Sequence, residues 1–179
     1  MLRKILIALA VIIVVFVVVV AMQPADFRIT RTATIAAPPE AIFQQVNDLG
    51  KWEAWSPWAK MDPKAKMTFT GPQAGVGASF SWAGNSEVGE GSNTIVESKP
   101  SEMVKFRLEF IKPMKATNTT EFTFQPEGGK TVVTWTMTGR NGFMGKAFGL
   151  FVNCDKMVGG DFEKGFASMK AIVEAKPGT

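Results

Sequence analysis

Short segments with strictly alternating apolar and polar residues dominate the second half of the sequence. In Val104–Phe110 every second residue is apolar, and charged residues stand between them. Phe122–Gln125 and Val133–Met137 repeat the pattern, with the turn sequence Pro126–Gly129 between them. Alternation places the apolar side chains on one face of a strand, and short connections join antiparallel neighbours. The pattern therefore predicts an antiparallel sheet with one apolar and one solvated face.

Further strands are expected before this region. Phe27–Ile35 is a mostly alternating segment, and we predict that it forms the first strand. Phe80 and Trp82 alternate with serines, and Gly84-Asn85 is expected to be a two-residue hairpin loop after them. Thr94–Glu97 is expected to be a strand. The sequence thus predicts a meander of strands from about residue 66 onward.

Three segments have the spacing of helices. Pro38–Gly50 opens with prolines and repeats apolar residues at helical intervals. Trp52–Trp58 contains three tryptophans at a spacing of three, which predicts a short helical turn whose indoles fill the core; an indole lining a pocket is the alternative. From Met144 to Ile172, apolar residues lie close to one stripe, which predicts a helix across the apolar face of the sheet, bent or broken near Gly159-Gly160.

An uninterrupted apolar stretch, Ile5–Met22, lies near the N-terminus. As a helix it would extend about 27 Å, close to the thickness of a bilayer core. Arg3 and Lys4 precede it and favour a cytoplasmic N-terminus, with the following domain on the other side. We expect an uncleaved anchor at 1–22, a linker at 23–26 and one domain at 27–179; a cleaved signal peptide, leaving a secreted or periplasmic domain, is the alternative.

The composition excludes several classes of function. The 179 residues include no His, no Tyr and a single Cys, Cys154. The absence of His removes His-ligated metal sites and imidazole bases, and a single Cys excludes internal disulfides and cysteine-cluster metal sites. The net charge is +4, and Arg3 and Lys4 supply two of these charges, so the surplus is too small to favour nucleic acid. We expect no metal, no cofactor and no nucleic-acid partner; the oligomeric state stays open.

Three motifs together carry a family resemblance. Ile35–Phe43 reads Ile-Ala-Ala-Pro-Pro-Glu-Ala-Ile-Phe, Asp48 and the motif Trp52–Trp58 follow, and Gly160–Lys170 lies in the tail. These motifs resemble the polyketide-cyclase/dehydrase branch of the SRPBCC, or START-like, superfamily, over about Phe27–Ala175. The resemblance implies an α+β helix-grip fold: a curved antiparallel sheet wrapped around a long C-terminal helix, with a hydrophobic cavity between them. It leaves function open, because one fold hosts many activities.

The size of this cavity is limited by stability. An empty apolar void of about 300 Å³ would cost roughly 7 kcal/mol, whereas net stabilities are only about 5–15 kcal/mol. Bulky side chains must therefore reduce the cavity, or a lipophilic ligand must fill it. We expect the apolar residues of the inner sheet face and the tail to line it: Trp55, Trp82, Phe106, Leu108, Phe122, Phe124, Trp135, Met137, Met144, Phe148 and Phe151.

Asp155 interrupts the apolar stripe of the tail between Phe151 and Val158. This acid either meets water at a helix end or forms the polar group of the pocket, and we include it among the expected lining residues. No other acid is singled out by its position, so no catalytic residue is assigned. Without His, Tyr or a Cys–base pair, general acid–base chemistry would require a carboxylate or a lysine.

These observations predict a membrane-anchored domain that binds a hydrophobic small molecule, lipid-, quinone- or polyketide-like, without catalysing a reaction. One alternative is a cyclase- or dehydrase-type enzyme that uses Asp155 or a lysine in the pocket. The other is an interaction module with a filled core and no ligand. A defined pocket would separate the first two from the third, and a buried, strongly perturbed acid inside it would favour the enzyme.

Overall fold

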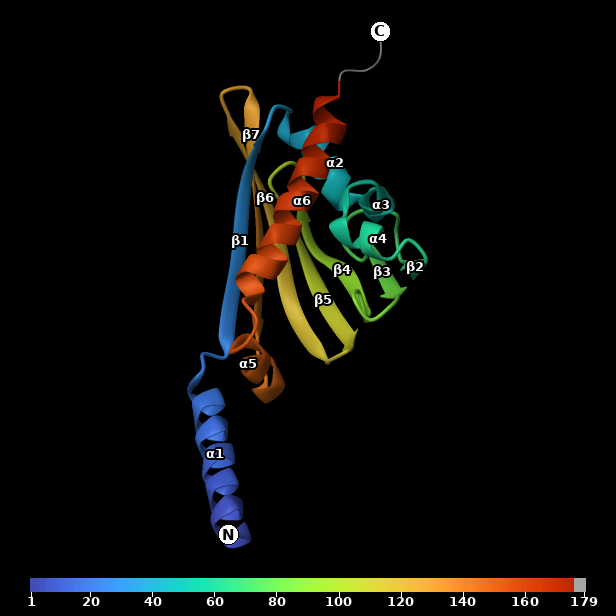
Figure 1. The fold of residues 1–179 in the computed structure, drawn as a ribbon. Coiled ribbons are helices and arrows are strands. Elements are labelled where there is room, and N and C mark those ends of the chain that lie inside the picture. Colours follow the sequence, from blue (N-terminus) through green and yellow to red (C-terminus); the bar gives the residue numbers. More distant parts are fainter. Residues whose placement is uncertain (176–179) are drawn as a thin grey trace.

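A computed structural model describes residues 1–175 of the chain. Its centre is a curved antiparallel sheet of seven strands in the order β1-β7-β6-β5-β4-β3-β2 (Figure 1). The expected α+β helix-grip fold is therefore confirmed. The strands are β1 (Asp26–Ile35), β2 (Lys66–Thr70), β3 (Ser79–Ala83), β4 (Glu90–Lys99), β5 (Met103–Lys112), β6 (Ala116–Glu127) and β7 (Lys130–Arg140).

Helices surround one face of this sheet. The long C-terminal helix α6 runs across the inner, concave face, and the short helices after β1 lie beside its C-terminal half (Figure 1). The helices are α1 (Leu2–Met22), α2 (Pro39–Asn47), the 3-10 turn η1 (Leu49–Lys51), α3 (Trp52–Trp55), α4 (Pro57–Met61), α5 (Phe143–Gly149) and α6 (Cys154–Glu174).

The alternation seen in the sequence sets which side chains face inward. Directly opposed residues in antiparallel strands share a face, and Phe106, Thr120, Met137 and Ile29 form one such row across β5, β6, β7 and β1. These four side chains are all buried. Between them, the outward positions are mostly Thr, Lys, Arg and Glu, which gives the sheet the predicted solvated face.

The tail is broken, but not near Gly159-Gly160 where we expected a bend or break. The chain breaks between α5 and α6, and α6 continues without interruption through Gly159-Gly160. The start of α6 is fixed by Asn153, whose side chain accepts a hydrogen bond of 2.9 Å from the Lys156 amide. Gly159 does not interrupt the helix but lets the guanidinium group of Arg31 approach it closely, because a Cβ at this position would overlap that group.

The loop after β3 is also longer than expected. The predicted two-residue hairpin at Gly84-Asn85 is a loop from Gly84 to Gly89, and β4 begins at Glu90. The side chain of Asn85 accepts hydrogen bonds from the amides of Glu87 and Val88, which stabilises the extra turn. The expected turn at Pro126–Gly129 is confirmed as a two-residue connection, with positive φ at Gly128 and Gly129.

Helix α1 extends away from the sheet (Figure 1). It is long and apolar enough to cross a membrane, and a signal sequence has the same properties. Its side chains are exposed except at Val20, near its C-terminal end, where it contacts α5. The Lys146 ammonium of α5 donates a hydrogen bond of 3.2 Å to the Ala21 carbonyl in the last turn of α1.

Candidate functional site

The inner face of the sheet has two halves with different packing. We call the first the closed half: Trp52 and Trp55 of α3, Phe122 and Trp135 of the sheet, and Phe162 of α6, all of them buried. The rings of Trp135 and Phe162 stack in parallel with centroids 3.9 Å apart, and those of Phe122 and Trp135 lie 4.5 Å apart. Such contacts add to the gain from burial. Aromatic rings therefore fill the space between sheet and α6 at this end.

The tryptophan-rich motif closes this half from the side. Trp52 and Trp55 lie on α3, and their indole N–H groups donate to the Val46 carbonyl at 2.8 Å and the Gln45 carbonyl at 3.0 Å. Trp55 also contacts Trp135 edge-to-face at 5.7 Å. Both indoles therefore pack in the core, as the spacing of the tryptophans predicts.

The second half, which we call the open half, has an apolar floor on β2, β3 and β5: Met67, Phe69, Trp82, Leu108 and Phe110. Cross-strand pairing places all five on the inner face. Met67 and Phe69 are 44% and 55% exposed, and the other three are half-buried. The rings of Trp82 and Phe110 meet edge-to-face at 5.8 Å. This half therefore presents contiguous apolar surface that the fold itself does not bury.

Buried polar side chains lie where the two halves meet. Asn93 and Asn118 flank Leu108 in one cross-strand row, and Thr120 lies opposite Phe106 in the next. All three polar side chains are buried. Within residues 1–175, Asn93 Oδ1 and Thr120 Oγ1 have no hydrogen-bond partner. A buried polar atom without a partner costs about 1–3 kcal/mol, so these atoms suit a ligand with a complementary polar group.

The structure brings most of the predicted lining residues to the inner face. Those in or next to the closed half are buried, and two lie on the open floor. The polar residues Asn93, Asn118 and Thr120 were not predicted as part of the site. Asn93 lies two residues before Ile95, and Thr120 and Asn118 lie two and four residues before Phe122, so alternation places all three side chains inward. The inner-face residues that were predicted are Trp55, Trp82, Phe106, Leu108, Phe122, Phe124, Trp135 and Met137.

Three predicted lining residues lie elsewhere. Met144 and Phe148 are on α5 and Phe151 follows it, and their exposed fractions are 65%, 45% and 79%. The chain break before Cys154 is the reason, because it separates α5 from the helix that covers the sheet. In this structure these side chains do not enter the space between the sheet and α6.

Asp155 also lies outside that space. Its carboxylate accepts hydrogen bonds from both terminal nitrogens of Arg31 at 3.2 and 3.0 Å, and Arg31 Nε donates to Glu163 at 2.9 Å. Hydrogen bonding to Arg31 lowers the pKa of Asp155, and the two carboxylates raise the pKa of Arg31. Asp155 is therefore an ionised partner that ties the start of α6 to β1, with both oxygens occupied.

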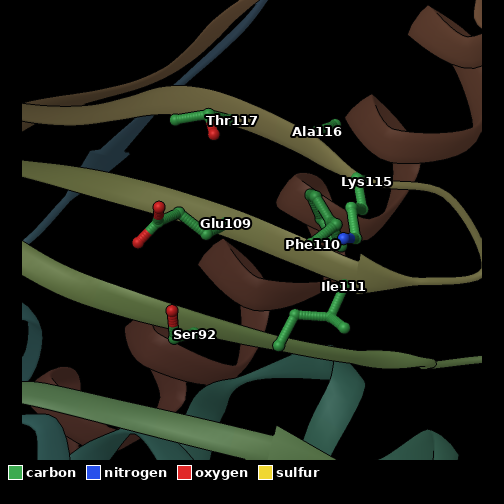
Figure 2. Close-up of a pocket in the computed structure, with 7 residues that line it drawn as sticks. All are labelled: Ser92, Glu109, Phe110, Ile111, Lys115, Ala116 and Thr117. Atoms are coloured by element: carbon green, nitrogen blue, oxygen red, sulfur yellow. The ribbon is translucent and has the colours of Figure 1, made fainter.

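Two open hollows occur on other surfaces. The first, about 520 Å³, lies on the outer face of the sheet, where Ser92, Glu109 and Thr117 point away from the helices, with Lys115 at its edge (Figure 2). The second, about 460 Å³, is formed by Asn141 and residues 149–154. Neither lies between the sheet and α6. Among residues 1–175, no cluster of three or more His, Cys, Asp or Glu side chains could hold a metal ion.

The sequence is similar to that of a known protein family. A family model described as "Polyketide cyclase / dehydrase and lipid transport" matches residues 26–174. No curated protein matches the sequence significantly.

Several solved structures share the fold. The CV1439 protein from Chromobacterium violaceum superposes with a TM-score of 0.61 at 15% identity, over 86% of this chain and 100% of its own. The solution structure of the Aha1 dimer from Colwellia psychrerythraea gives 0.61 at 17% identity, over 85% of this chain and 99% of its own. Ms6760 from Mycobacterium smegmatis gives 0.58 at 20% identity, over 83% and 91%.

Proposed function

Because this chain belongs to the polyketide cyclase/dehydrase and lipid transport family, we propose that it binds a hydrophobic small molecule on the open half of its inner sheet face. The observation that carries this proposal is the apolar floor beside buried polar atoms that lack partners. The matching ligand is mostly apolar and has one polar group, as lipids, quinones and polyketides do. The apolar part would cover Trp82, Leu108 and Phe110, and the polar group would reach Asn93 and Thr120.

The position and pairing of Asp155 favour binding without catalysis. Asp155, the acid expected to serve an enzyme of this family type, is exposed and its oxygens accept from Arg31. A carboxylate with a lowered pKa is a poor general acid, and bidentate pairing with Arg31 competes with a role as base. The polar atoms that we propose for the ligand, the amide oxygen of Asn93 and the hydroxyl of Thr120, can orient a bound group but are not acids or bases.

The site is proposed to lie at a membrane. Helix α1 has 21 residues, or about 31 Å, which matches the hydrocarbon core of a bilayer. We expect the full chain to float with lipid vesicles and to resist extraction by alkali. The fragment Phe27–Thr179 should stay in solution. If expression of the full sequence instead yields soluble protein whose N-terminus lies near Met22, the segment is a cleaved signal peptide.

Titration of the fragment Phe27–Thr179 with N-phenylnaphthylamine tests the binding proposal. This fluorescent probe is apolar and has one N–H donor that suits Thr120 Oγ1 or Asn93 Oδ1. We expect saturable binding at one site. Thr120→Val should weaken it between about two- and tenfold, the range of a single hydrogen bond, without lowering the free energy of unfolding.

Thr119→Val is the matched control, because the adjacent Thr119 side chain is exposed on the outer face of the same strand. It should leave the affinity for the probe unchanged. A titration that does not saturate would favour the interaction module with a filled core. If Thr120→Val and Thr119→Val bind the probe with equal affinity, Thr120 does not contribute to the site.

A further inference from the structure

The short helix α5 has no buried residue. Phe143, Met144 and Phe148 on it, and Leu150 and Phe151 after it, are between 37% and 79% exposed. It has only seven residues and includes Gly145 and Gly149. Isolated helices of this length are unstable in water, and glycine weakens them further. The domain itself therefore leaves this apolar surface uncovered.

Helix α1 indicates what covers it. Val20 of α1 is buried against α5, and the Lys146 ammonium binds the Ala21 carbonyl at the end of α1. If α1 spans a bilayer, its last turn lies at the boundary between the acyl chains and the head groups. Because α5 contacts this turn, α5 must lie at the same depth. Figure 1 shows α5 beside the end of α1, on the side of the domain from which α1 extends.

The charges around α5 fit the same surface. The segment 140–153 contains Arg140 and Lys146 and no acidic residue. The end of β5 and its turn into β6 lie at the same end of the sheet (Figure 1), and they add exposed Ile111 and Met114 with Lys115 beside Met114. Lys112, between them, forms an ion pair with Glu90 at 2.7 Å. Apolar side chains flanked by cations are typical of segments that lie in the interface of a membrane with anionic lipids.

We infer that α5 and the following residues Leu150 and Phe151 dock into the surface of the bilayer that α1 spans. This inference rests on the proposed anchoring by α1 and is independent of the proposed ligand. The docked segment fixes the orientation of the domain and turns the α5 end of the sheet toward the lipid.

Fluorescence of the full chain in vesicles of phosphatidylcholine and phosphatidylglycerol tests this inference. The label, nitrobenzoxadiazole, is attached to Phe151→Cys in a Cys154→Ser background, since Cys154 is the only native cysteine. We expect blue-shifted emission, strongly quenched by a lipid with a nitroxide near the head-group end of its acyl chain. The control is a label at Glu127→Cys, exposed at the β6–β7 turn on the opposite end, which should emit as in water (Figure 1).

A second variant checks the contribution of α5 itself. Phe143→Ser combined with Phe148→Ser, both at exposed positions, should reduce the quenching at position 151 several-fold while the chain still floats with vesicles. A chain that does not float would overturn the anchor and the docking together. A floating chain with an unquenched label would overturn the docking alone. Blue-shifted emission that the nitroxide lipid does not quench would assign the surface to a second copy of the chain and also overturn it.

Discussion

The two halves of the inner sheet face are built from similar residues and differ in what covers them. In the closed half, Trp135 stacks on Phe162 of α6, and Trp55 meets Phe122 and Trp135 edge-to-face. In the open half, Trp82 and Phe110 also meet edge-to-face, but both stay half-buried. The comparison separates a half whose aromatic rings bury one another from a half that leaves apolar surface exposed, and we propose that the ligand binds on the second.

The largest expected effect is in the closed half. Trp55 is fully buried, and Trp55→Ala should lower the free energy of unfolding by about 3–5 kcal/mol, as other large aromatic truncations do. Urea unfolding of the fragment Phe27–Thr179 measures it, with Phe69→Ala on the open floor as the control at less than about 1.5 kcal/mol. A loss below about 1 kcal/mol for Trp55→Ala would show that this half is not the main source of stability.

Substitutions in the open half should change the affinity for a ligand. Trp82→Ala removes the largest ring of the open floor and should lower the affinity for N-phenylnaphthylamine about tenfold or more, equivalent to about 1.4 kcal/mol. Phe151→Ser is the control, because Phe151 is exposed and lies away from the inner face. We expect it to bind the probe as the parent does. A Phe151→Ser variant with weakened binding would place Phe151 in the lining of the site, as the sequence predicted.

The ion pairs of Arg31 on β1 with Asp155 and Glu163 on α6 are expected to contribute to the stability of the closed half. Gly160 has open space around it, so Gly160→Ala should stabilise the helix by up to about 1 kcal/mol through helix propensity. Gly159→Ala should lose this gain, since its Cβ would displace the Arg31 guanidinium from Asp155 and Glu163. Thermal unfolding of the two variants provides the comparison, and equal stabilities would show that the Arg31 contact is unimportant.

The smallest expected effect is a dependence of stability on pH. Hydrogen bonding to Arg31 holds the pKa of Asp155 below its ordinary value of 3.8 in the folded chain. The stabilisation from this pair is therefore complete above about pH 4 to 5 and is lost as the pH falls through the folded pKa. Melting temperatures of the parent and Asp155→Asn should converge on acidification below pH 4. Parallel curves would mean that the ion pair contributes nothing measurable.

Sequence periodicity predicted the sheet well because a strand has only two faces. The positions of Leu108, Phe122 and Trp135 on one face follow from alternation alone, and the apolar stripe of the tail predicts the helix that covers it. Periodicity identifies apolar residues without identifying what covers them, so it could not separate the closed half from the open half. It also grouped Phe151 with α6, because a helical stripe continues in sequence across the chain break that Asn153 fixes in space.

Polar residues inside the sheet were missed for a related reason. Asn93 and Asn118 occupy inward positions, where the alternation predicts apolar side chains, and an amide there reads as an interruption of the strand. Arg31 is inward too, and its role depends on Gly159, far away in the sequence. Such pairs are set by tertiary contacts, which no local pattern contains.

The connection between α1 and the domain is very short. Only Gln23, Pro24 and Ala25 separate the end of α1 from the start of β1, and three extended residues reach roughly 10 Å. With α1 in a bilayer, the domain cannot leave the lipid surface to deliver a cargo across an aqueous gap. It can search only by lateral diffusion, in two dimensions. A donor or acceptor of its ligand must therefore reside in the same membrane or come to its surface.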